Sequence, residues 1–212
     1  MALCAVVFDF GMVLSGQPDP AAYAEMLRIT GLSRNQFEPR YWADRLAYDE
    51  GKLTGLAFWQ KFMRDAGMPA SQETAEELNR WDARYWTTEN PAMLAWQLAL
   101  KQRGLLTAIL SNMGDHVCVS VEREFAWIRR FDVLVWSYRL GIAKPDPATY
   151  RHTLNELGVQ DGETLFIDDK QPNIEAARAL GMQAVLFSSV DRLRDDLIAL
   201  GLDSQLPLPG SE

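Results

Sequence analysis

The sequence predicts an α/β fold, a Rossmann-like doubly wound parallel sheet of about five strands with an inserted helical cap. Two observations indicate the sheet. Helical patterns alternate with short, continuously apolar runs from residue 91 onward, and a similar run stands at residues 3–8. Such runs are typical of parallel strands that are covered on both faces. The third observation indicates the cap, since residues 17–90 contain helical patterns and no convincing strand.

The predicted cap consists of several helices. The first covers Ala21–Ile29, the pattern Ser33-x-x-Gln36 resembles a capping box, and Pro39 is expected to begin a fresh helix. A further helix follows Thr54 and ends at Gly67. The last helix carries four large residues on one face, Leu78, Trp81, Tyr85 and Trp86. The cap aromatics, among them Trp42, Trp59, Trp81 and Trp86, are expected to form a bundle core rather than a ligand cage.

The second half of the chain supplies the rest of the sheet. Asn90 and Pro91 begin a helix that Gly104 ends. The strands that follow are predicted at residues 105–110, 131–136, 164–167 and 184–187. The helices are predicted at residues 115–126, 147–157, 172–180 and 191–200. Residues 203–212 are expected to form a loose tail. We therefore predict a catalytic core domain of residues 1–16 and 91–212 and a helical cap domain of residues 17–90.

Composition excludes several classes of function. The 212 residues carry a net charge of −8, which opposes nucleic-acid binding. No apolar run approaches the roughly 20 residues of a membrane span, and the N-terminus lacks the basic region of a signal peptide. The two cysteines, Cys4 and Cys118, have no zinc-ligand spacing and indicate a reducing compartment. We expect a cytoplasmic protein without nucleic-acid or membrane partners.

Polar residues gather where the predicted strands end. Each one alone has an ordinary interpretation as a helix cap, a turn residue or a solvated side chain. All of them together at one sheet edge are much less expected by chance, and ligands of open α/β sheets bind at that edge. The residues are Asp9, Ser111, Asn112, Asp168 and Asp169 at strand ends, and Lys144 beyond the 131–136 strand.

This combination indicates phosphate chemistry. Crowded carboxylates require a cation, and oxygen ligands of this kind suit Mg²⁺. Lys144 and Ser111 suit a phosphate group, as a positive charge and as a hydrogen-bond donor. One carboxylate, Asp9, remains as a nucleophile that would form an aspartyl-phosphate.

Four segments in order resemble the motifs of the haloacid dehalogenase-like hydrolase superfamily. FDFGMVL resembles the first motif, ILSN the second, GIAKPDPATY the third and LFIDDKQPNIEAARALGM the fourth. The resemblance implies Asp9 as nucleophile and metal ligand, and Ser111 and Asn112 beside the phosphate. It implies Lys144 as the contact to nucleophile and phosphate, Asp169 as metal ligand, Asp168 as an accessory acid at the metal, and Asn173 in a supporting position. The insert matches the subfamily whose cap lies between the first two motifs, and YDEGKLTGLAFWQKF looks typical of such caps.

One position departs from the family pattern. Phosphatases of the family usually carry an acid–base Asp two residues after the nucleophile, where this sequence has Gly11. The backbone carbonyl of Gly11 could still bind Mg²⁺, but the acid–base carboxylate is missing. A subgroup with a similar Asp-x-Gly start includes sugar-phosphate phosphatases. His116 is a weak candidate for a substitute acid, and the cap stretch with Tyr48, Glu50 and Lys52 is placed to meet the substrate.

Three functions remain open. The leading hypothesis is a Mg²⁺-dependent phosphatase that acts on a small phosphorylated metabolite such as a sugar phosphate, as a monomer or homodimer. The second is a 2-haloacid dehalogenase that uses Asp9 without metal, although such enzymes lack an acidic pair like Asp168-Asp169. The third is a binding or regulatory family member with weakened catalysis, for which Gly11 is the only support.

Overall fold

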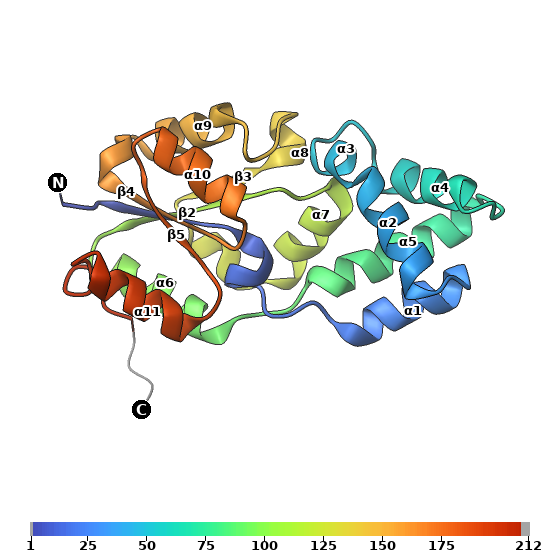
Figure 1. Cartoon of the computed structure of the whole chain (residues 1–212), viewed down its shortest axis with the longest axis horizontal. Coiled ribbons are helices and arrows are strands. Elements are labelled where there is room, and N and C mark those ends of the chain that lie inside the picture. Colours follow the sequence, from blue (N-terminus) through green and yellow to red (C-terminus); the bar gives the residue numbers. More distant parts are fainter. Residues whose placement is uncertain (1, 209–212) are drawn as a thin grey trace.

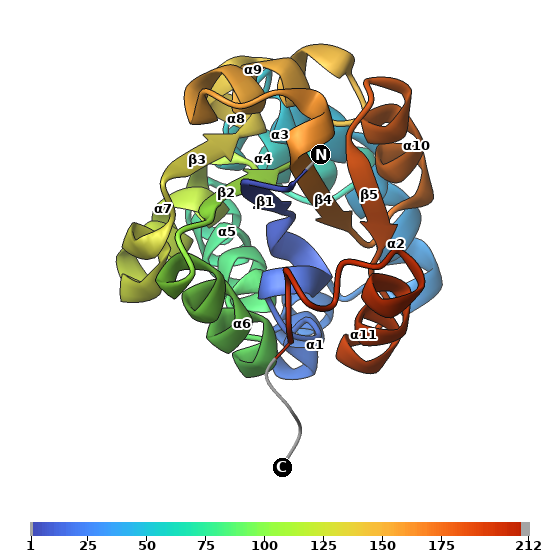
Figure 2. The same ribbon diagram turned by 90° about the vertical axis from the view of Figure 1, so that its left-hand side faces the viewer.

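The sheet occupies the centre of one half of the molecule. A computed structural model describes residues 2–208. Its strands are β1 (Ala5–Phe8), β2 (Leu106–Ser111), β3 (Val133–Trp136), β4 (Thr164–Asp168) and β5 (Gln183–Leu186). All neighbouring strands are parallel, in the order β3-β2-β1-β4-β5 (Figure 2). The five-stranded α/β sheet confirms the predicted fold class.

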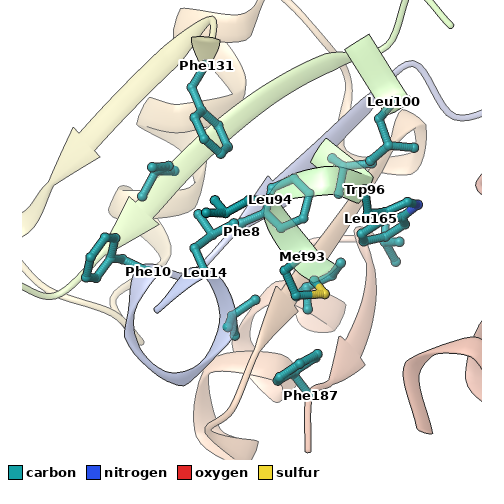
Figure 3. Close-up of a cluster of buried hydrophobic side chains, with 14 of the residues drawn as sticks. Phe8, Phe10, Leu14, Met93, Leu94, Trp96, Leu100, Phe131, Leu165 and Phe187 are labelled. Atoms are coloured by element: carbon teal, nitrogen blue, oxygen red, sulfur yellow. The ribbon is translucent and has the colours of Figure 1, made fainter. Parts of the chain in front are cut away.

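Helices cover both faces of this sheet. The helices α6 (Pro91–Gln102), α7 (Asp115–Glu124) and α11 (Val190–Ala199) pack with one face, and α9 (Pro147–Leu157) and α10 (Gln171–Ala179) with the other (Figure 2). Alternate residues of each strand point to opposite faces, so β1 serves two cores. Phe8 packs against Trp96 on the first face (Figure 3), and Val7 lies in the cluster of Tyr150 on the second. These short strands are largely apolar because both faces are buried.

The first five α-helices after β1 form a separate cluster at the carboxyl ends of the strands (Figure 1). They are α1 (Pro20–Thr30), α2 (Arg34–Ala43), α3 (Arg45–Asp49), α4 (Gly55–Asp65) and α5 (Gln72–Trp86). Their core includes Phe37, Trp59 and Leu78, all fully buried. We call these helices the cap; the exact domain boundaries stay a prediction. Among the described residues, no helix is both long and apolar enough to cross a membrane.

The chain leaves and re-enters the sheet half at one place. Asn90 precedes α6, and its backbone N–H donates to the carbonyl of Leu14 at 2.9 Å. Its side-chain amide donates to the carbonyl of Val13 at 3.1 Å. The two connections between the sheet half and the cap therefore run side by side.

Three local expectations were wrong or incomplete. Pro39 lies inside the continuous helix α2 and does not begin a new one. The lost hydrogen bond costs about 3 kcal/mol and is offset by the burial of Phe37 and Tyr41 on the same helix. The expected loose tail is ordered as far as it is described, because Leu206 is fully buried in the sheet core; residues 209–212 lie outside the described chain. The helix predicted over 115–126 ends at Glu124, and a 3-10 turn covers Ala126–Arg130.

Candidate active site

Asp9 stands at the end of β1 in a fixed conformation. Its Oδ1 accepts the backbone N–H of Phe10 at 2.7 Å, which caps a tight helical turn over Phe10–Leu14. Met12 in this turn has φ of +61°, and its N–H donates to Oγ of Ser15 at 2.8 Å. The Phe10 side chain packs into the core (Figure 3). The turn thus anchors a buried carboxylate at the sheet edge.

Lys144 joins the ends of three strands. Its Nζ lies 3.0 Å from Oδ1 of Asp9 and donates to Oδ2 of Asp168 and to the carbonyl of Leu110, both at 2.7 Å. Burial lowers the pKa of Lys144, but the two carboxylates outweigh burial and hold this pKa above its ordinary value. For Asp9, burial raises the pKa against the opposing effect of Lys144. The ammonium group is therefore charged and shared between two acids.

The two acids of the fourth strand have different surroundings. Asp168 is fully buried and accepts hydrogen bonds from Lys144, from the amide of Asn173 at 2.9 Å and from the backbone N–H of Lys170 at 2.8 Å. Asp169 is half-buried and lines the cavity above the sheet edge. Burial, with the charges of Asp9 and Asp168, raises the pKa of Asp169 to about 6. Asp168 thus orients Lys144, and Asp169 faces the open space.

The acidic cluster fits a magnesium ion. Asp9, Asp168 and Asp169 each offer a carboxylate oxygen, and these atoms lie within 4.8 Å of one another. Gly11 lines the same cavity, so the predicted carbonyl ligand belongs to this site. Mg²⁺ prefers carboxylate and carbonyl oxygens, and a dication would relieve the repulsion that raises the pKa of Asp169. The individual ligand roles stay predictions.

The second strand contributes the other side of the site. Ser111, the last residue of β2, is buried and lines the cavity. Asn112 and Lys144 exchange two hydrogen bonds of 2.8 Å, from the Asn112 amide to the Lys144 carbonyl and from the Lys144 N–H to Oδ1 of Asn112. Asn112 therefore positions the segment that carries Lys144. The sequence-predicted residues come together at one edge of the sheet.

The cap closes the site with residues that the sequence interpretation missed. A cavity of 290 Å³ lies between the sheet edge and the cap, and the cap lines it with Trp42, Arg45, Asp49 and Trp86. The assignment of Trp42 and Trp86 to a bundle core was wrong, since Trp42 is 50% exposed and both line the cavity. Trp59 is fully buried, as expected for a core residue.

The remaining candidates lie elsewhere. His116 is in the first turn of α7, and among the described residues it is not part of the cavity lining. Tyr48, Glu50 and Lys52 also do not line the cavity; Tyr48 is fully buried in the cap core. The only sequence signal for the pair Arg45 and Asp49 is opposite charges four residues apart on one helix, and this spacing does not distinguish a buried ion pair from an exposed one.

The candidate site lies at the carboxyl edge of a parallel sheet beneath a helical cap. The chain belongs to the haloacid dehalogenase-like hydrolase family, whose sequence model matches residues 5–181. It is 30% identical to Phosphatase MT3486 of Mycobacterium tuberculosis over 211 residues, which are 95% of this chain and 96% of that protein.

Two solved structures share the fold. One is a family enzyme from Bacteroides thetaiotaomicron, bt-2542, with a TM-score of 0.78 and 19% identity over 93% of this chain and 99% of that one. The same enzyme has been crystallised with magnesium and inorganic phosphate. The other is the 2-haloacid dehalogenase of Pseudomonas syringae, with a TM-score of 0.66 and 19% identity over 97% and 100% of the two chains.

Proposed function

We propose that this hydrolase is a Mg²⁺-dependent phosphatase that hydrolyses a small phosphorylated metabolite through an aspartyl-phosphate on Asp9. One observation carries the proposal: the buried Asp9 shares a cavity with Ser111, Lys144 and Asp169. The full-length likeness to a phosphatase supports it. So does the magnesium and phosphate complex of a protein with the same fold.

The residues of this chain act in two steps. A carboxylate oxygen of Asp9 attacks the phosphorus, so the bond to the leaving oxygen breaks as the aspartyl-phosphate forms. The positive charge of Lys144 favours the ionised form of Asp9 for this attack, and the Ser111 hydroxyl donates a hydrogen bond to a phosphate oxygen. Water then attacks the phosphorus, which releases phosphate and regenerates Asp9.

Asp9, Asp169 and the Gly11 carbonyl would hold a magnesium ion, with Asp168 as an accessory acid, and the ion would neutralise charge on the phosphate. Because Gly11 has no carboxyl side chain to protonate the leaving oxygen, the substrate's leaving group matters. A leaving group that tolerates negative charge demands little protonation, and an anomeric sugar phosphate is one such substrate. Because their leaving groups need little protonation, sugar phosphates are among the proposed substrates.

The test is an assay of an aryl phosphate with and without Mg²⁺, in which Asp9→Asn serves as the control. We expect turnover that requires the metal and is abolished by the substitution. Chloride release from a 2-haloacid in the presence of EDTA would instead identify a dehalogenase. Inactivity in both assays would favour a binding or regulatory protein.

A further inference from the structure

Gly11 provides no side chain beside the nucleophile, so an acid for the leaving group would have to come from another element, such as the cap. A Cβ atom placed on Gly11 would lie 3.9 Å from Cζ3 of Trp86 and 4.0 Å from Oδ2 of Asp9. Both are ordinary van der Waals distances, so a side chain would fit there, and the backbone φ of −62° suits any residue. Besides Asp9 itself, the described residues of the sheet half bring no carboxyl within 4 Å of this Cβ position, and the cap side chain of Trp86 lies next to it.

The cavity contains a carboxyl that the proposed mechanism does not use. Among the described residues, its titratable side chains are those of Asp9, Arg45, Asp49, Lys144, Asp169 and Lys170. Asp9 is the nucleophile and Asp169 faces the metal site. The lysines and the arginine are cations, suited to bind phosphate or to pair with acids. Asp49 is the carboxyl that remains.

The backbone of Asp49 is attached to the sheet edge. The hydroxyl of Ser137 donates to the carbonyl of Asp49 and accepts the backbone N–H of Met113 at 2.9 Å. Ser137 directly follows Trp136, which pairs with Ser111 in the parallel register of β2 and β3. The cap residue is therefore held over the strand end that carries the predicted phosphate contact.

Of the two carboxylate oxygens of Asp49, one accepts a hydrogen bond from a described residue and the other does not. Its Oδ1 accepts from Nε of Arg45 at 3.1 Å. Within the described chain its Oδ2 accepts no hydrogen bond, and the residue is only 9% exposed. Arg45 thus fixes the orientation of the carboxyl and leaves Oδ2 available to a ligand in the cavity.

A buried network limits how far Arg45 stabilises the charge of Asp49. Arg45 also lies 3.1 Å from the fully buried Asp82, to which Tyr41 donates at 2.6 Å. One guanidinium is shared by two carboxylates. Burial raises the pKa of Asp49, Arg45 and the nearby Lys170 lower it, and Asp82 raises it again, with a net increase above the ordinary value. A carboxyl of this kind suits general acid catalysis.

We propose that Asp49 is the acid–base residue of this site, and this inference rests on the proposed phosphatase function. As the P–O bond breaks, the protonated Asp49 donates its proton to the leaving oxygen, which departs as an alcohol. The Asp49 carboxylate then takes a proton from the water that attacks the aspartyl-phosphate. The cycle consumes one ester and one water and returns both aspartates to their starting states.

The test compares Asp49→Asn with the matched control Glu50→Gln, an acid next to it outside the cavity. Each is assayed on an aryl phosphate, whose leaving group needs no proton, and on an alkyl phosphate, whose leaving group does. We expect Asp49→Asn to lower kcat on the alkyl ester by on the order of 100-fold or more and on the aryl ester by far less. Glu50→Gln leaves both rates unchanged.

A second variant separates catalysis from structure. Adding Gly11→Asp to Asp49→Asn places a carboxyl beside the nucleophile and is expected to restore most of the alkyl-ester rate. The kcat/KM of the wild type falls as pH rises through the pKa of the acid, and Asp49→Asn loses this limb. Equal losses on both esters, a change in KM alone, or no rescue would overturn the inference. A wild type inactive on both esters would instead overturn the proposed function.

Discussion

At the scale of single residues, the site places three carboxylates near one ammonium group, that of Lys144. Asp9 and Asp168 share Lys144, whereas Asp169 has no such partner among the described residues. Its pKa of about 6 against an ordinary 3.8 means that ionised Asp169 destabilises the fold without metal. This cost is complete well above pH 6 and shrinks as the pH falls below 6, because the carboxyl of the folded protein then becomes protonated. It vanishes only below the ordinary pKa of 3.8, where the carboxyl is protonated in both states.

Asp169→Asn is therefore expected to stabilise the metal-free protein at pH 7.5 by about 1 kcal/mol, after allowance for solvent screening at a half-buried group. Thermal or urea unfolding in EDTA measures the gain, which should shrink as the pH falls below 6 and vanish below pH 3.8. Added Mg²⁺ should reverse the order. At 100 times its Kd it stabilises the wild type by about 2.7 kcal/mol and the variant much less. Equal stabilisation of both proteins by Mg²⁺ would contradict the assignment of Asp169 to the metal.

At the scale of elements, the turn after α3 docks the cap on the sheet half. Gly51 has φ of +71°, and a Cβ atom there would lie 2.6 Å from the carbonyl oxygen of Tyr138. Tyr138 belongs to α8 (Ser137–Leu140), which follows β3. This close backbone approach lies two residues from Asp49, so the docking of the turn and the shape of the cavity depend on each other.

Gly51→Ala should push α3 away from α8 and lower kcat/KM by about tenfold or more, since small displacements of positioning groups are costly. Gly31→Ala is the matched control. Gly31 also has a left-handed φ, of +64°, but a Cβ atom there meets nothing within 4 Å. The control should lose about 1 kcal/mol of stability and keep its activity. Comparable activity of the two variants would show that the close approach does not position the site.

Local patterns predicted many of these elements, and tertiary contacts explain where they failed. Continuous apolar runs predicted the strands because both sheet faces are buried. Pro39 misled the helix assignment because the burial of Phe37 and Tyr41 outweighs its local penalty. Trp42 and Trp86 were misplaced because helical periodicity shows which residues share a face, and it does not show whether that face meets a core or a cavity.

At the scale of the whole molecule, the segment that follows α11 returns to the residues just before β1. Leu206 is fully buried in the core beneath the sheet, and the side chain of Gln205 donates to the carbonyl of Leu3. No helix or strand pattern marks this segment, so the sequence predicted a loose tail. Long-range packing of this kind leaves no periodic signal. The convergence of the site, in contrast, was predictable, since parallel strands that end in polar residues must bring them to one edge.

Leu206→Ala is expected to destabilise the protein by about 2–4 kcal/mol, because it removes buried methyl groups and leaves a cavity. Leu200→Ala is the matched control, since Leu200 is 51% exposed, and should cost less than about 1 kcal/mol. Chemical denaturation at neutral pH measures both values. Similar small losses for the two variants would mean that residues beyond α11 do not contribute to the core.

The paired connections at Leu14 and Asn90 have an evolutionary consequence. A continuous segment enters and leaves through two adjoining points, and β1 and β2 on either side of it pair directly with each other. Such a segment can be lengthened, shortened or exchanged by recombination without breaking the sheet. Lys144, Asp168 and Asp169 come from strands and loops that this exchange would not touch. New substrate preferences, and another acid–base residue in place of Asp49, can therefore arise in a lineage by replacing this one segment, while Asp9, Lys144 and the acids of the fourth strand are inherited unchanged.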